Sequence, residues 1–217
     1  QLVELAAFML DLPDAEVSAF GVRNAEIVYR PDPSSAIAWR EVAAKMGNYM
    51  IVGRGARGPN PDDKALNTFG AQFAEVEVNT ETGHVRVKTL VAAHAIGRIV
   101  NPMTAASQLY GGAIMGLGFA TTEERTIDAS TGLQLTANMR EYKVPRIDDM
   151  PEFVVEFVDR VDGEANSVGA KGLGEPPVIP TPAAIANAVS DALGVRLVDL
   201  PITADRVLSA LSSREEA

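Results

Sequence analysis

Apolar and polar positions in the first fifty residues alternate between helical and extended patterns. Apolar residues recur at helical spacing over residues 2–12, which predicts a helix that Pro13 ends. The runs VSAFGV (17–22) and AEIVYR (25–30) predict two short strands. AWREVAAKMG (38–47) predicts a second helix, with its final glycine as the stop signal.

The middle of the chain has a strongly extended pattern. FAEVEV (73–78) and HVRVKTLVAAH (84–94) alternate apolar and polar residues, and NTETG (79–83) between them predicts a hairpin turn. TIDASTGLQLT (126–136) predicts a second hairpin with its turn at residues 130–132. EFVVEFVD (152–159) predicts a further strand.

Helices are predicted on both sides of that last strand. Asn101 or Thr104 could cap a helix whose glycine and alanine content suggests close packing against a neighbour. Two more helices are predicted near residues 182–193 and 204–211. Because strand pairs mix with helices without a regular βαβ alternation, the predicted fold class is α+β.

Composition narrows the range of partners. The 217 residues carry a net charge of −10 and no run of basic residues, which argues against nucleic acid and an anionic membrane as partners. No apolar stretch approaches the roughly 18–20 residues that a membrane span needs. Cysteine is absent, so the chain has no disulfide and no cysteine-bound iron–sulfur cluster. The opening QLVELAAFMLDL has neither an initiator methionine nor a basic leader, which suggests a piece of a longer polypeptide.

A glycine pattern near residue 55 matches a nucleotide-binding signature only weakly. GRGARG (53–58) fits GxGxxG and lies in a run, residues 49–63, that reads as a strand leading into a loop. A phosphate site of this type needs a helix that starts inside the pattern, and Pro59 and Pro61 disfavour one. A plain exit from a strand is therefore the favoured interpretation.

The histidines do not form a metal site. His84 and His94 are ten residues apart on one predicted strand, about 33 Å at the usual rise per residue. They cannot share a metal ion, and we expect one surface histidine and one structural histidine. The charged stretch EYKVPRIDDMPE (141–152) is expected to be a solvated loop.

The segment over residues 101–118 admits two interpretations. Its small residues would let a large ligand approach the backbone, and its hydroxyl and amide groups can bond phosphate or pterin edges. Alternatively, the segment is a buried helix that uses glycine for close contact. The residues concerned are Thr104, Ser107, Gln108, Gly111, Gly112, Gly116 and Gly118.

GAKGLGEPP (169–177) is similarly ambiguous. It is either a glycine loop with an exposed glutamate, or a loop whose Gly172 and Gly174 let the backbone wrap a cofactor while Glu175 acts as a general base. Burial beside apolar groups would suit such a glutamate to proton abstraction near neutral pH. Pro176 and Pro177 restrict the backbone just after Glu175 and would fix its direction.

Taken together, these stretches carry a family resemblance. GRIVNPMTAASQLYGGAIMGLGFATTEE, YKVPRIDDMPEF and GAKGLGEPPVIPTPAAIANAVSDALG, in this order, resemble the molybdenum-binding subunit of the xanthine dehydrogenase and aldehyde oxidase family of molybdenum hydroxylases. The match is strong over residues 67–217 and less specific over residues 1–66. It fits the C-terminal part of that subunit.

The resemblance implies a fold, a cofactor and a reaction. The fold is the second lobe of the α+β molybdenum-cofactor-binding domain, and the cofactor is molybdopterin, usually the cytosine dinucleotide form in bacterial members. In the family, the glutamate after the glycine loop takes a proton from a molybdenum-bound hydroxyl, and the oxygen attacks an aldehyde or N-heterocycle carbon. Glu175 matches that residue. Electrons then leave through [2Fe-2S] and FAD groups, which we expect on partner chains.

The resemblance implies cofactor contacts at two places in this chain. Lys171, Gly172, Leu173 and Gly174 match the loop that lies against the cofactor. A second group of eight residues matches a cofactor-binding loop and helix start. No residue is expected to bind molybdenum directly. Where the xanthine-oxidising members carry a glutamine, this chain has Met115, which favours an aldehyde or another heterocycle over xanthine. The second group is Thr104, Ala105, Ala106, Ser107, Gln108, Gly111, Gly112 and Met115.

The sequence is compatible with three functions. The first is a molybdenum hydroxylase piece that works with a polypeptide carrying the N-terminal lobe. The others are a non-catalytic module that carries or inserts the molybdopterin nucleotide, and an inactive scaffold. Glu175 favours the enzyme, because a carrier has no use for a base. We expect a cytoplasmic protein, or a periplasmic one if a partner exports it.

Overall fold

The chain forms two compact units, Gln1–Arg57 and Gly58–Ala217, each with its own core. The computed structural model describes residues 1–47, 50, 52–53, 55–56, 58–158 and 160–215. The predicted run over residues 49–63 and its GRGARG lie partly outside the described residues, and the described ones there form neither helix nor strand. In the part of the chain described, no helix is both long and apolar enough to cross a membrane.

The first unit is a small sheet with two helices. Helix α1 (Leu2–Met9) and helix α2 (Trp39–Lys45) confirm the two helix predictions, and Gly47 beyond α2 has a φ of +60°. The apolar faces of these two helices pack against the sheet, and Ala6, Ile27 and Val42 in the core between them are fully buried. The three strands pair antiparallel in the order β1 (Phe20–Arg23), β2 (Glu26–Tyr29) and β3 (Ala36–Ala38).

Two details of the first unit differ from expectation. Residues Val17–Ala19 form a 3-10 turn, because the amide of Ala19 bonds the carbonyl of Glu16, so the first strand begins only at Phe20. Strand β3 was not predicted, because AIA is too short to show a period-two pattern.

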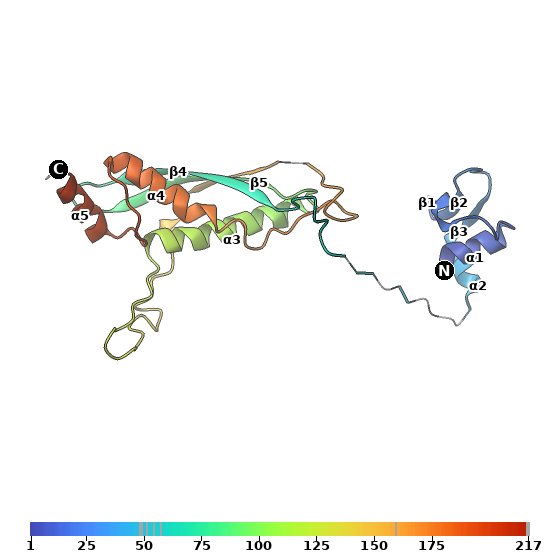
Figure 1. The fold of residues 1–217 in the computed structure, drawn as a ribbon, viewed down its shortest axis with the longest axis horizontal. Helices are drawn as coiled ribbons and strands as arrows, with labels where there is room; N and C mark the ends of the chain where they lie inside the picture. The colour runs from blue at the N-terminus through green and yellow to red at the C-terminus, as the bar shows by residue number, and fades with distance from the viewer. Residues whose placement is uncertain (48–49, 51, 54, 57, 159, 216–217) are drawn as a thin grey trace. The chain divides into compact units, whose positions relative to one another are not determined.

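The second unit is a three-stranded sheet covered on one face by helices (Figure 1). Strand β4 (Phe69–Val78) pairs antiparallel with β5 (Val85–Ala95), and β5 pairs parallel with β6 (Glu152–Phe157). The turn between β4 and β5 is the predicted hairpin, closed by a 2.8 Å bond from the Gly83 amide to the Asn79 carbonyl.

Three helices complete this unit. Helix α3 (Pro102–Thr121), helix α4 (Pro180–Leu193) and helix α5 (Ala204–Glu215) confirm the three predicted helices, although α4 starts two residues early. The Asn101 carboxamide oxygen accepts from the Thr104 amide at 3.1 Å, which identifies Asn101 as the cap of α3. Helices α3 and α4 lie side by side under the sheet (Figure 1). Their shared core includes Leu90, Ala113, Leu117, Ile185, Val189 and Val207.

The second predicted hairpin forms only in part. A single bridge joins Ile127 to Gln134, and the turn between them is organised by the Asp128 carboxylate, which accepts from the amides of Ser130 and Thr131. Its residues are mostly exposed and pair with no third strand in the described structure. A lone two-stranded ribbon is marginal in water, so no regular strands develop.

Candidate functional site

The loop that precedes α4 is tied at its start to the connection between β5 and α3. The Lys171 amide donates to the Ile96 carbonyl at 2.8 Å, and the Arg98 amide donates to the Gly169 carbonyl at 2.7 Å. The Asn166 carboxamide oxygen accepts from several backbone amides of the same loop. These bonds place the beginning of the glycine loop beside the entrance to α3.

The Lys171 side chain binds to other residues of the same chain and so stabilises this loop. Its ammonium group lies 2.9 Å from the Asp162 carboxylate and 3.2 Å from the Asn67 carbonyl. The two charged side chains are only 16% and 22% exposed, and the hydrogen bond from Lys171 lowers the pKa of Asp162. The charge of Lys171 is therefore already paired within this chain.

The end of the loop is pressed against α3 and α4. A β carbon on Gly112 would collide with Pro177, and one on Gly116 would collide with Thr181. Both glycines are buried, so their missing side chains are explained by close packing. For Gly112 and Gly116, the packed-helix interpretation is the one that the geometry supports.

Between these two anchors lies an open stretch, Gly172 to Glu175. Gly172 and Gly174 are exposed, and no atom lies within 4 Å of a β carbon built on either. Leu173 is half-buried. Glu175 is exposed as well, as in the first of the two interpretations of this loop, and none of the described segments covers its side chain.

One face of α3 is open beside this loop. Thr104, Gln108, Gly111 and Met115 follow one another at helical spacing, and all four are exposed. No atom lies within 4 Å of a β carbon built on Gly111, in contrast to its neighbour Gly112. Because Gly112 packs on Pro177, the structure brings the two predicted segments, α3 and the Glu175 loop, into contact.

The remaining predicted residues of α3 have local roles. The Ser107 hydroxyl donates to the Met103 carbonyl at 2.9 Å, and the Thr104 hydroxyl lies 3.3 Å from the Asn101 carbonyl. Ala105 and Ala106 are half-buried. In the described part of the chain, the Gln108 side chain has no hydrogen-bond partner, so its amide is available to a ligand.

These groups fit an anionic, extended cofactor. The backbone N–H groups of Gly172, Leu173, Gly174 and Glu175 have no acceptor among the described residues, so each is available to an oxygen of a ligand. The open glycines leave the backbone accessible. No group of three or more His, Cys, Asp or Glu residues in the described structure could hold a metal ion.

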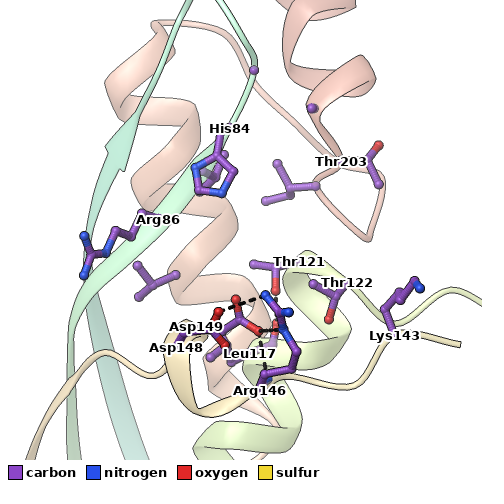
Figure 2. Close-up of a pocket in the computed structure, with 15 residues that line it drawn as sticks. His84, Arg86, Leu117, Thr121, Thr122, Lys143, Arg146, Asp148, Asp149 and Thr203 are labelled. Carbon is purple, nitrogen blue, oxygen red and sulfur yellow. Dashed lines mark hydrogen bonds and ion pairs between the residues drawn. The ribbon is translucent and has the colours of Figure 1, made fainter. Parts of the chain in front are cut away.

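A separate hollow of about 670 Å³ lies at the other end of α3 (Figure 2). The β4–β5 turn, the end of α3 and the loop before β6 line it, and Arg146 pairs there with Asp148 at 2.9 Å. Both side chains are well exposed, as expected for a solvated charged loop. None of the predicted cofactor residues lines this hollow, so we do not assign the site to it.

Two buried polar residues and one half-buried polar residue lie together near the loop, and no pattern in the sequence indicated that they meet. His94 and Thr181 are at most 1% exposed, and Gln72 joins them from β4. One surface histidine and one structural histidine were expected, and the structure confirms this with His84 exposed and His94 buried. Gln72 lies one residue before the predicted strand, and a polar residue on the inward face of that strand is the signal that could have revealed it.

Comparison with known proteins identifies the family of this fold. The family model described as a molybdopterin cofactor-binding domain matches residues 1–151. The aldehyde oxidoreductase molybdenum-binding subunit of Escherichia coli (strain K12) is 43% identical over 145 residues, which cover 67% of this chain and 20% of that protein. The putative xanthine dehydrogenase molybdenum-binding subunit of the same strain is 39% identical over 139 residues, covering 64% and 18%.

A solved structure shares the fold. Quinoline 2-oxidoreductase from Pseudomonas putida 86 superimposes with a TM-score of 0.77 at 22% identity, over 97% of this chain and 28% of that one. At this identity the likeness concerns the fold alone. The chain spans about a fifth of the length of the curated relatives it matches.

Proposed function

The chain belongs to the molybdopterin cofactor-binding domain family, and from this premise we propose that it is the C-terminal part of the molybdenum-binding subunit of a hydroxylase. The proposed reaction is the oxidative hydroxylation of an aldehyde or N-heterocycle. The observation that carries the proposal is the exposed Glu175, held at the end of four free backbone N–H groups and beside the open face of α3. A carboxylate in this place can act on a ligand that the loop binds.

The chain's own residues have distinct tasks in this proposal. The N–H groups of residues 172–175 bind phosphate or pterin oxygens, and the Gln108 amide adds a polar contact from α3. A carboxylate oxygen of Glu175 accepts the proton of the oxygen nucleophile. When bound, the molybdenum cofactor, proposed to be the cytosine dinucleotide form, supplies the oxygen transfer and accepts the two electrons of the substrate.

The proposed substrate class rests on the residue at position 115 and on the names of the similar proteins. Met115 is exposed on α3 at the place where the xanthine-oxidising members carry a glutamine amide. Its thioether cannot donate a hydrogen bond, which disfavours xanthine. The relative with 43% identity is named an aldehyde oxidoreductase subunit. We therefore place aldehydes first and other heterocycles second.

Partners are part of the proposal. A cofactor loses most of its surface in a concave site, and the open stretch over residues 172–175 is only one wall of such a site. Phe69 and Phe73 on β4 are 72% and 65% exposed, which suits a surface that another polypeptide covers. We propose that this polypeptide carries the N-terminal lobe, and that [2Fe-2S] and FAD subunits take the electrons. A cytoplasmic assembly, or a periplasmic one exported with a partner, fits this scheme.

Metal analysis tests the proposal. The chain is purified alone and together with the polypeptide that carries the N-terminal lobe, and molybdenum, pterin, oligomer mass and aldehyde oxidation are measured. We expect stoichiometric molybdenum and turnover only in the complex. A monomer of this chain with stoichiometric cofactor would contradict the need for a second lobe. A complex with full cofactor content and no turnover on aldehydes or heterocycles would identify a carrier instead of an enzyme.

A further inference from the structure

The two fully buried polar side chains in the described structure lie at one point of the second unit. His94 of β5 is 1% exposed and Thr181 of α4 is 0% exposed. Gln72 of β4 lies between them and contacts both. Buried polar groups cost free energy unless they are hydrogen-bonded, so a cluster of three needs a reason.

The cluster converges on one backbone carbonyl. The Gln72 side-chain nitrogen donates to the Pro177 carbonyl at 2.7 Å. The Thr181 hydroxyl donates to the Gln72 carboxamide oxygen and lies 3.1 Å from the same Pro177 carbonyl. Pro177 itself is fully buried, with Gly112 of α3 against its ring. The Pro177 ring is therefore held by α3 and its carbonyl by Gln72 of β4, whose carboxamide the Thr181 hydroxyl of α4 orients.

His94 completes the arrangement around Gln72. Its Nε2 lies 3.4 Å from the Gln72 side-chain nitrogen, which donates to it if the imidazole carries its proton on Nδ1. Burial lowers the pKa of His94, so the neutral ring that this bond requires is favoured. In that tautomer the buried Nδ1–H of His94 has no partner among the described residues. The orientation of the Gln72 carboxamide therefore rests on its bonds to the Pro177 carbonyl and the Thr181 hydroxyl.

Pro177 lies only two residues after Glu175. The Val178 amide donates to the Glu175 carbonyl at 3.0 Å, so Glu175 and Val178 close one tight turn around the two prolines. Because the prolines fix their own φ angles, an anchor at Pro177 also sets the direction of the backbone at Glu175. The other end of the loop is held separately, by the Thr68 hydroxyl on the Gly172 carbonyl at 2.6 Å.

We propose that Gln72 and Thr181 are positioning residues for Glu175, acting through the Pro177 carbonyl. The proposal rests on the proposed function, in which Glu175 is the base. A displacement of about 1 Å at a reacting group can cost about 100-fold in rate. Loss of the hydroxyl or the carboxamide therefore lowers kcat, whereas cofactor content stays, because neither side chain lies in the open stretch over residues 172–175.

The test uses variants that separate hydrogen bonding from packing. Thr181→Val keeps the shape of the side chain and removes the hydroxyl, Thr181→Ser restores the hydroxyl, and Gln72→Leu removes the carboxamide. The matched control is Thr121→Val, because the Thr121 hydroxyl donates to the Leu117 carbonyl of its own helix at 2.8 Å and has no other partner in the described part of the chain. Each is measured in the molybdenum-loaded complex for kcat, KM and metal content.

We expect Thr181→Val and Gln72→Leu to lower kcat by about 10- to 100-fold, with KM and molybdenum content unchanged. Thr181→Ser and Thr121→Val should stay close to the parent protein. A parent-like kcat in Thr181→Val would overturn the proposal. So would equal losses in Thr181→Ser and Thr181→Val, because packing and not the hydroxyl would then be responsible.

A second readout needs no turnover. In the full chain, hydrogen exchange of the Val178 amide reports on the turn that carries Glu175, and Thr181→Val should accelerate it by about tenfold. An unchanged exchange rate contradicts the anchor even if turnover falls. If Glu175→Gln retains full turnover, the proposed base is wrong, and this exchange measurement still decides whether Gln72 and Thr181 hold the loop.

Discussion

Gly112 of α3 lies directly against Pro177, two residues beyond Glu175. Any side chain at Gly112 would collide with the proline ring, so helix and loop approach more closely than another residue would allow. This contact brings together two of the three sequence segments that carry the family resemblance. Gly112 therefore serves packing, whereas the neighbouring Gly111 has open space where a ligand could approach.

Neighbouring glycines on α3 should respond in opposite ways to alanine. Gly112→Ala forces the loop away from the helix and should cost about 1–3 kcal/mol of unfolding free energy. Gly111→Ala adds a methyl group in open space and should stabilise the helix by up to about 1 kcal/mol. Thermal or urea unfolding of the two variants measures the difference. Equal effects would show that Gly112 is not a packing contact.

Gly172 should matter for cofactor content and not for folding. It is exposed, and a β carbon built there has no described atom within 4 Å, so Gly172→Val should leave the melting temperature unchanged. In the complex the same side chain intrudes where the backbone is proposed to approach the cofactor, and molybdenum and pterin should be lost. Gly163→Val is the control, since Gly163 is also exposed and open. Full metal content in Gly172→Val would argue against a close approach.

The β4–β5 turn depends on Gly83 for two reasons. Its φ is +74°, and a β carbon there would strike the Ala204 carbonyl at the start of α5. Gly132 has a φ of +72° but open space around it. Gly132→Ala should therefore lower the free energy of unfolding by about 1–2 kcal/mol, because alanine disfavours a left-handed backbone. Gly83→Ala should lower it clearly more, because the collision with the Ala204 carbonyl is added. Unfolding curves that show the same loss in both would contradict the contact with α5.

Stability should fall in mild acid because of His94. Burial lowers its pKa below the ordinary 6.5, so the unfolded chain takes up a proton at His94 at a higher pH than the folded chain does. Between these two pKa values the unfolded state binds more protons, and the unfolding free energy decreases as pH falls below about 6.5. Exposed His84 is the control. The pH dependence of the melting temperature should persist in His84→Gln and flatten in His94→Gln; the reverse result would contradict the burial of His94.

Periodicity predicted the helices and long strands well, because 3.6- and 2-residue patterns are strong over the lengths of α3, β4 and β5. It failed where tertiary contacts or local turns decide. The strand expected from Val17 starts at Phe20 because of a 3-10 turn, and residues 126–136 form one bridge because no third strand supports them.

The site was predictable in outline only. The loop over residues 171–175 and the start of α3 were identified by composition and resemblance, and the structure packs Pro177, just beyond this loop, on Gly112 in the middle of α3. The roles of Gly111 and Gly112 could not be separated in sequence, because both are glycines in one helix and only the neighbour Pro177 distinguishes them. The cluster at Gln72 was missed because its three members are far apart in sequence and meet only in the folded chain.

The most direct test of the account is the turnover of Glu175→Gln in the molybdenum-loaded complex. The change removes the proton-accepting carboxylate and keeps its size, and the exposed Glu81→Gln in the β4–β5 turn is the control. A positioned base contributes about 10²–10⁴ in rate, so kcat should fall by at least that factor while metal and pterin content remain complete. A Glu175→Gln complex with full molybdenum content and the turnover of the parent protein would contradict the central claim.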